Sequence, residues 1–193
     1  MKNKRIILFP AVLIMVLLYC LRVYQLSKED YIYNILYYHL GEEVSLDNDF
    51  FDIKQDAPNG YSIKVVKTEL ISRDDFMYEY NISEEAIPYF YENVYLVTAK
   101  FHNYNEILNQ NTGVNLTYYV LQDDEYMTYA YREVIPAINN INTFTFSLIP
   151  NSDAELIIPF FINPKYVSIQ RLKNGNPTLI VSLYPNKKSI YLN

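Results

Sequence analysis

An uncharged apolar run near the start constrains this chain more than any other feature. Ile6 and Leu21 bound 16 residues without a charged side chain, which would extend for about 24 Å as a helix. A bilayer core is about 30 Å thick, so the run can cross it if Arg22 snorkels toward the headgroups and the next two residues lengthen the span. The sequence therefore predicts that residues 1–22 form an N-terminal transmembrane helix that serves as a membrane anchor.

Cleavage and lipidation are the two alternatives to a retained anchor. A secretory peptidase cuts after small residues, whereas Leu18, Tyr19 and Cys20 stand at the end of this run. Lipid attachment at Cys20 would require a small residue where the chain has Tyr19. We therefore expect an uncleaved signal-anchor, with a lipoprotein or a cleaved signal peptide as the alternatives.

The distribution of charge predicts the orientation of the chain and excludes one class of partner. Lys2, Lys4 and Arg5 precede the run without an acidic residue, so the N-terminus stays in the cytoplasm and the C-terminal part is extracellular. Residues 23–193 carry 12 basic and 22 acidic residues, a net charge of −10. Such a domain is a poor partner for nucleic acid, which requires clustered cations. The two neighbouring lysines at residues 187–188 are too few for such a cluster, and we interpret them as a solvated turn.

The extracellular part is predicted to be one β-rich domain, residues 41–193, joined to the anchor by a stalk, residues 23–40. The 21 tyrosines and 10 phenylalanines of the whole chain favour strands. Within residues 93–103, Tyr95, Val97, Ala99 and Phe101 share one face and Thr98, Lys100 and His102 share the other, which is the pattern of a half-buried strand. The strands that we expect are residues 41–46, 61–65, 93–103, 116–122, 143–149, 154–162 and 178–184. Seven short strands between turn signals predict an antiparallel sandwich.

Two local irregularities are also predicted. The residues of the apolar face stand at odd-numbered positions up to Val65, and past Lys67 they stand at even-numbered positions. This change indicates a β-bulge. Ser72 followed by Asp75 resembles a capping box and predicts one short inserted helix, and a further helical turn is expected from Ser83 to just before Pro88.

The order of these segments resembles a known family. A basic start and apolar run precede GEEV with DFF, then NGYSIKV, NVYLVTAKFHN and IPNSDAELIIPFFI. This order is similar to an uncharacterised family of membrane-anchored or lipoprotein-like envelope proteins of Gram-positive bacteria, which resemble telokin-like, immunoglobulin-like extracellular domains. The resemblance covers most of residues 41–184 and implies an immunoglobulin-like antiparallel β-sandwich, without implying a catalytic residue.

The residues give no pattern of catalytic or metal-binding chemistry. His39 and His102 are the two histidines, and neither has neighbouring ligands. We interpret the acidic clusters at residues 47–52 and 123–125 as solvated turns rather than calcium sites. Asp74 with Glu79 is a carboxylate pair of the kind that a glycoside hydrolase uses, although any acidic domain offers such pairs. We therefore expect no cofactor, no metal and no catalytic residue.

The tyrosine surplus suggests a contact surface instead. The stretch YMTYAYR places Tyr126, Tyr129, Tyr131 and Arg132 beside a turn, and exposed aromatic clusters often mark sugar or protein contacts. The sequence thus predicts a non-enzymatic, single-pass protein of the cell membrane that binds a protein or a surface polysaccharide. The alternatives are an accessory subunit of an envelope transporter or secretion machine, and an envelope hydrolase that uses a carboxylate pair.

Overall fold

The computed structural model describes residues 14–24, 34–52, 58–107, 113–124 and 126–193. The chain divides into two compact units, Met1–Tyr33 and Asn34–Asn193. In the first unit, residues 14–24 form a helix that includes Leu21 and Arg22 of the predicted anchor, whereas Ile6 lies outside the described residues. Within the described ranges, no helix combines the length and the hydropathy that crossing a bilayer requires.

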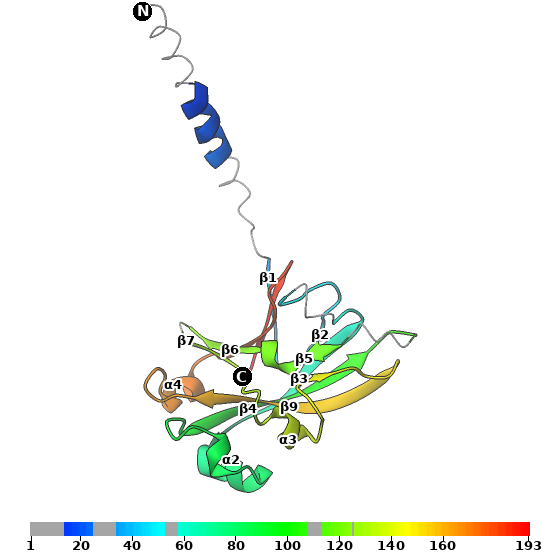
Figure 1. Ribbon diagram of the computed structural model, residues 1–193, viewed down its shortest axis with the longest axis vertical. Coiled ribbons are helices and arrows are strands. Elements are labelled where there is room, and N and C mark those ends of the chain that lie inside the picture. The colour runs from blue at the N-terminus through cyan, green and yellow to red at the C-terminus, as the bar shows by residue number, and fades with distance from the viewer. Residues whose placement is uncertain (1–13, 25–33, 53–57, 108–112, 125) are drawn as a thin grey trace, which may run out of the picture. The chain divides into compact units, whose positions relative to one another are not determined.

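The second unit is a mainly-β sandwich (Figure 1). Its strands are β1 (Ile35–Tyr38), β2 (Glu43–Ser45), β3 (Tyr61–Ser72), β4 (Asn93–Asn103), β5 (Val114–Asn115), β6 (Val120–Asp123), β7 (Tyr126–Tyr129), β8 (Thr145–Phe146), β9 (Ser152–Ile162), β10 (Thr178–Ser182) and β11 (Lys187–Tyr191). One sheet has the order β1-β11-β10-β6-β7, the other has the order β2-β3-β4-β9, and β5 pairs with β8. The predicted sandwich is therefore confirmed.

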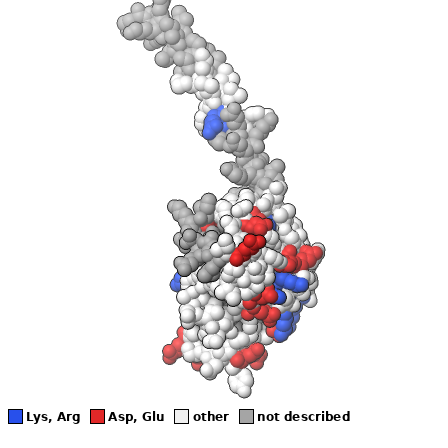
Figure 2. Space-filling view, turned by 90° about the vertical axis from the view of Figure 1, so that its right-hand side faces the viewer, with Lys and Arg blue, Asp and Glu red and all other residues white. Residues whose placement is uncertain are grey.

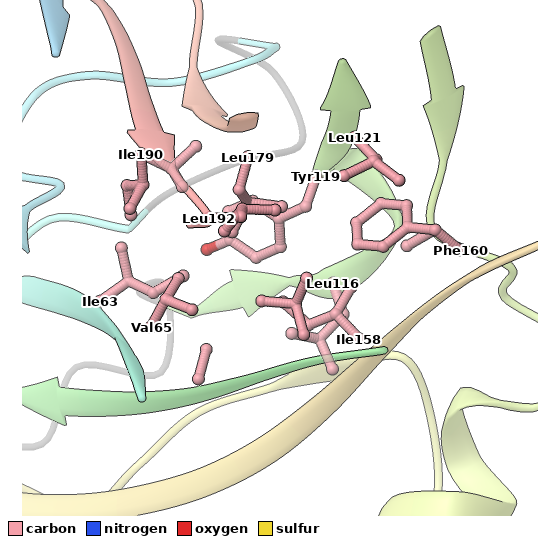
Figure 3. Close-up of a cluster of buried hydrophobic side chains, with 14 of the residues drawn as sticks. Ile63, Val65, Leu116, Tyr119, Leu121, Ile158, Phe160, Leu179, Ile190 and Leu192 are labelled. Atoms are coloured by element: carbon pink, nitrogen blue, oxygen red, sulfur yellow. The ribbon is translucent and has the colours of Figure 1, made fainter. Parts of the chain in front are cut away.

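The main hydrophobic core lies between the two larger sheets (Figure 3). Ile63 pairs with Phe101 across β3 and β4, and Val97 pairs with Ile158 across β4 and β9, so the apolar positions of neighbouring strands coincide. The facing sheet contributes Leu121, Leu179 and Ile190, among others. Because alternate residues of a strand point to opposite faces, this register gathers the apolar side chains of both sheets on the sides that face each other.

β3 contains the predicted bulge. The pairing of β3 with β4 shifts between Val65 and Lys67, which leaves Val66 as the extra residue. Before the shift, Ile63 and Val65 point into the core, and after it Leu70 packs against the same core. The bulge thus lets one 12-residue strand keep its apolar side chains inward although their parity changes.

A second, smaller core covers part of the outer face of the four-stranded sheet. The helix α2 (Arg73–Tyr80) begins at Ser72, whose hydroxyl accepts a hydrogen bond from the Asp75 amide at 3.0 Å, as predicted. Phe76 of this helix packs with Val94 and Leu96, which point outward from the first half of β4. The 3₁₀ turn η1 (Glu84–Ala86) follows where the further helical turn was expected. The second half of β4 is left uncovered by this core.

Several predicted elements were wrong in extent or kind. The domain contains α3 (Ile135–Asn139) and α4 (Ile169–Asn174) besides α2, not one helix. Residues 116–122 begin with the 3₁₀ turn η2 (Leu116–Tyr118) before β6, and only Thr145–Phe146 of residues 143–149 form a strand. β1 lies within the predicted stalk and pairs with β11 in parallel, so the sandwich is not purely antiparallel and its unit starts at Asn34 rather than at residue 41.

The interpretation of three charged segments, residues 47–52, 123–125 and 187–188, as solvated turns is also wrong. Lys188 is 6% exposed on β11, and Asp49 and Asp123 are each 5% exposed. Asp49 forms an ion pair with Lys188, and Asp123 accepts from Arg171 of α4 at 3.0 Å. Each buried charge has a partner far along the chain, which a local pattern of polar residues does not reveal.

Candidate functional site

The uncovered half of the outer face of the four-stranded sheet carries a cluster of polar side chains. We call it the polar face. It consists of Glu43, Ser62, Lys64, Lys100, His102, Tyr104 and Asp153, which with Val66 line an open hollow of about 340 Å³. On the surface drawn in Figure 2, acidic and basic side chains lie beside one another. A hollow of this size is at the lower end of the range that small ligands occupy.

The strand register builds the polar face. From Thr98 onward the outward residues of β4 are polar, and they include Lys100 and His102. His102 is paired with Ser62 of β3 on one side and with Asp153 of β9 on the other. Directly opposite residues in an antiparallel sheet lie about 5 Å apart, so these three side chains form one row across the sheet.

Glu43 is held by two hydroxyl donors. Ser62 donates to its Oε1 at 2.5 Å, and Tyr104 donates to the same oxygen at 2.6 Å. These hydrogen bonds, that from Ser62 first, hold the pKa of Glu43 below its ordinary value. The same contact with Glu43 raises the pKa of the Tyr104 hydroxyl. Glu43 therefore stays ionised and both hydroxyls keep their protons at neutral pH.

Asp153 forms the second charged centre. Its Oδ2 lies 2.9 Å from Nζ of Lys100, and its Oδ1 lies 2.6 Å from Nδ1 of His102. Lys100 first and His102 second lower the pKa of Asp153, and Asp153 in turn raises the pKa of Lys100. His102 also packs edge-on against Tyr104, with ring centroids 4.1 Å apart. The imidazole is thus oriented by a carboxylate on one side and by an aromatic ring on the other.

The row of Ser62, His102 and Asp153 has the residue types of a catalytic triad but not its hydrogen bonding. In a triad the serine hydroxyl donates to the histidine. Here Ser62 donates to Glu43 and is only 2% exposed. The arrangement offers fixed donors and acceptors to a ligand rather than an activated nucleophile. Among the described residues, no group of three or more metal-ligating side chains converges.

The four residues predicted as a contact surface do not share one environment. Tyr126 of β7 packs against the main core and Tyr131 against the smaller core, and burial raises the pKa of both hydroxyls. Tyr129 is 64% exposed, and Arg132 is exposed and pairs with Glu133 at 3.1 Å. Tyr129 and Arg132 are therefore the two of the four that a partner could reach.

The other predicted candidates lie apart from one another. Asp74 pairs with Arg73 and is largely exposed, whereas Glu79 lines a separate hollow of about 460 Å³ that does not include Asp74. His39 packs against Tyr191 with ring centroids 5.5 Å apart. His102 alone of these residues belongs to the polar face.

Sequence reasoning placed His102 on the face of β4 that carries Lys100 but missed the residues that complete the site. Glu43, Ser62 and Asp153 come from three other strands, and Tyr104 follows β4. The available signal was the change from apolar to polar outward residues at Thr98, which marks where the cover of the sheet ends.

A family model described as a domain of unknown function, DUF5028, matches residues 35–188, from the first residue of β1 into β11. The chain is similar to a crystal structure of an uncharacterized beta-sandwich protein from Clostridium difficile 630, at 9% identity and a TM-score of 0.44, covering 83% of this chain and 95% of that chain. It is also similar to a conserved hypothetical protein from Bacillus anthracis, at 13% identity and a TM-score of 0.36, covering 77% and 95% of the two chains. No curated protein matches the sequence.

Proposed function

This chain belongs to the DUF5028 family, and we propose that it is a non-enzymatic binding module that holds a hydroxyl-rich surface polysaccharide on its polar face. In this proposal the N-terminal run anchors the protein in the cell membrane, and the immunoglobulin-like sandwich is extracellular. The observation that carries the proposal is an uncovered set of oriented donors and acceptors on a rigid sheet.

The chemistry of the polar face suits a polyol. A sugar hydroxyl both donates and accepts, and the face presents carboxylates, ammonium groups and hydroxyls within one hollow. Two carboxylates, two lysines and one histidine leave little net charge, which favours a neutral ligand over a strongly ionic one. Tyr104 is 55% exposed and adds an aromatic face on which a sugar ring can stack.

The absence of catalysis in this proposal rests on the hydrogen bond from Ser62 to Glu43. A serine whose proton is committed to a carboxylate, and whose side chain is buried, is poorly placed to attack a substrate.

The membrane location rests on the sequence of the first 22 residues. The basic residues Lys2, Lys4 and Arg5 and the uncharged run to Leu21 support an anchor with a cytoplasmic N-terminus. Protease added to whole cells should then degrade the domain and spare a cytoplasmic control protein. Protection of the domain would contradict the proposed location.

Binding is tested with the full chain in detergent and purified cell-wall polysaccharide in a sedimentation assay. Tyr104→Ala removes the exposed ring and the donor to Glu43, and we expect its affinity to fall about tenfold or more, the loss of one or two good contacts. Tyr166→Ala is the matched control, because Tyr166 is 66% exposed outside the polar face. Failure of the wild-type chain to bind would contradict the polysaccharide, and equal binding by both variants would place the contact elsewhere.

A further inference from the structure

A lysine and an aspartate are paired inside the sandwich. Lys188 lies two residues before Ile190 on β11, and both side chains point toward the main core. Asp49 comes from the segment that follows β2. The two side chains are 7% and 6% exposed, and Nζ of Lys188 lies 2.5 Å from Oδ2 of Asp49. Burial of an ion pair carries a desolvation penalty that often exceeds the attraction between the charges, so the pair is a weak device for stability if it stays ionic.

Neighbouring groups orient both partners. Nζ of Lys188 also donates to the carbonyl oxygen of Ser45 at 2.5 Å. Oδ1 of Asp49 accepts from the backbone N–H of Asn186 at 3.2 Å and from its side-chain amide at 3.0 Å. One carboxylate oxygen is therefore held by two N–H donors while the other faces the amine. Acyl transfer requires this combination of a fixed nucleophile and donors for the developing oxyanion.

We propose that Lys188 and Asp49 join in an intramolecular isopeptide bond. A bond forms between Nζ of Lys188 and Cγ of Asp49, and the bond between Cγ and Oδ2 breaks. Two of the three ammonium protons move to Oδ2, which leaves as water, and the third stays on the amide nitrogen. The step converts one positive and one negative group into a neutral amide, so charge balances and nothing is oxidised or reduced.

The Asn186 donors carry the charge of the tetrahedral intermediate on Oδ1. In the product, the amide N–H can keep the hydrogen bond to Ser45 that the ammonium makes now. The link would tie the segment after β2 to the last strand and restrain the unfolded chain, as a disulfide does. Residues 34–193 contain no cysteine, so no disulfide can supply this restraint. The inference does not depend on the proposed ligand.

Mass spectrometry of the full chain, purified in detergent and analysed intact and after proteolysis, tests the bond. The wild-type protein should be lighter than its sequence by one water, with a branched peptide that joins Asp49 and Lys188. Lys188→Arg keeps the cation but cannot form the amide, and it should show the full mass. Asp49→Asn should lose ammonia instead of water and give the same product mass as the wild type. Lys187→Arg, the neighbouring position on β11, should retain the link.

A wild-type chain with its full sequence mass and separate peptides would overturn the inference, whether or not the variants fold. A missing water that persists in Lys188→Arg would also overturn it, because the dehydration would then lie at another site.

Discussion

At the scale of single residues, hydrogen bonds determine the charge of the polar face. Ser62 and Tyr104 lower the pKa of Glu43 from its ordinary value of 4.5. A carboxyl whose pKa is lower in the folded state stabilises the protein above the ordinary value, and this contribution is lost as the pH falls through the folded pKa. The hydrogen bonds to Glu43 therefore affect the pH dependence of stability only under acid conditions.

The titration of Glu43, followed by NMR of its side-chain carboxyl, tests these hydrogen bonds. The wild-type midpoint should lie below 4.5, and Ser62→Ala should raise it more than Tyr104→Phe, because Ser62 makes the larger contribution. Tyr166→Phe, outside the polar face, should leave the midpoint unchanged. An identical midpoint in the wild type and in Ser62→Ala would show that this hydrogen bond does not form.

At the scale of elements, the bulge in β3 lets odd-numbered residues before it and even-numbered residues after it point into the same core. Deletion of Val66 removes the extra residue and the change of parity together, so Val65 and Thr68 would stay opposite Ala99 and Val97 in a regular ladder. We expect the deletion variant to keep cooperative unfolding in urea, as followed by circular dichroism, because the apolar side chains on both sides of the deletion stay inward. Val66→Thr should change stability by no more than about 0.5 kcal/mol, because Val66 is 38% exposed. Loss of cooperative unfolding in the deletion variant would contradict this account of the bulge.

The start of α2 provides a prediction with a matched control in the same chain. The Ser72 hydroxyl caps α2 by accepting a hydrogen bond from the Asp75 amide, so Ser72→Ala should lower the free energy of unfolding by about 1 kcal/mol. Ser83 stands at the equivalent position of η1 without a side-chain cap bond, and Ser83→Ala should have little effect. Urea titration of both variants measures the difference, and equal losses would refute the capping role of Ser72.

The elements that were predicted correctly carry their signal in their own residues. β4 alternates apolar and polar side chains from Val97 to His102, and Ser72 caps α2 through a residue three positions away, so neither signal depends on distant partners. β11 and β7 were missed because their identity depends on pairing. Lys187 and Lys188 by themselves suggest a solvated turn, but in the structure β11 lies between β10 and β1 and pairs with both. β7 begins and ends with a tyrosine, and the burial of its four residues differs from one to the next.

At the scale of the whole molecule, the site was less predictable than the fold. A sandwich follows from counting alternating strands, whereas the polar face depends on which residues of four strands lie beside one another. His102 meets Ser62 and Asp153 through registers that connect residues about 40 and 50 positions away. Local periodicity contains no information about that register.

The composition of the domain gives a prediction for the molecule as a whole. Cys20 is the one cysteine of the chain and lies outside Asn34–Asn193. The midpoint of thermal unfolding of the sandwich should therefore be the same with and without a reducing agent. Calorimetry of the full chain in detergent measures this, and a lower midpoint in reductant would reveal a link between chains through Cys20.

The parallel pairing of β1 with β11 has a mechanical consequence. The chain enters the sandwich at Ile35 and approaches its end at Tyr191, at opposite ends of this ladder. A pull between the two termini would slide the strands along each other and stretch the bonds of the ladder together, instead of opening them one after another. The two strands are thus loaded in shear, a geometry that resists force far better than unzipping does.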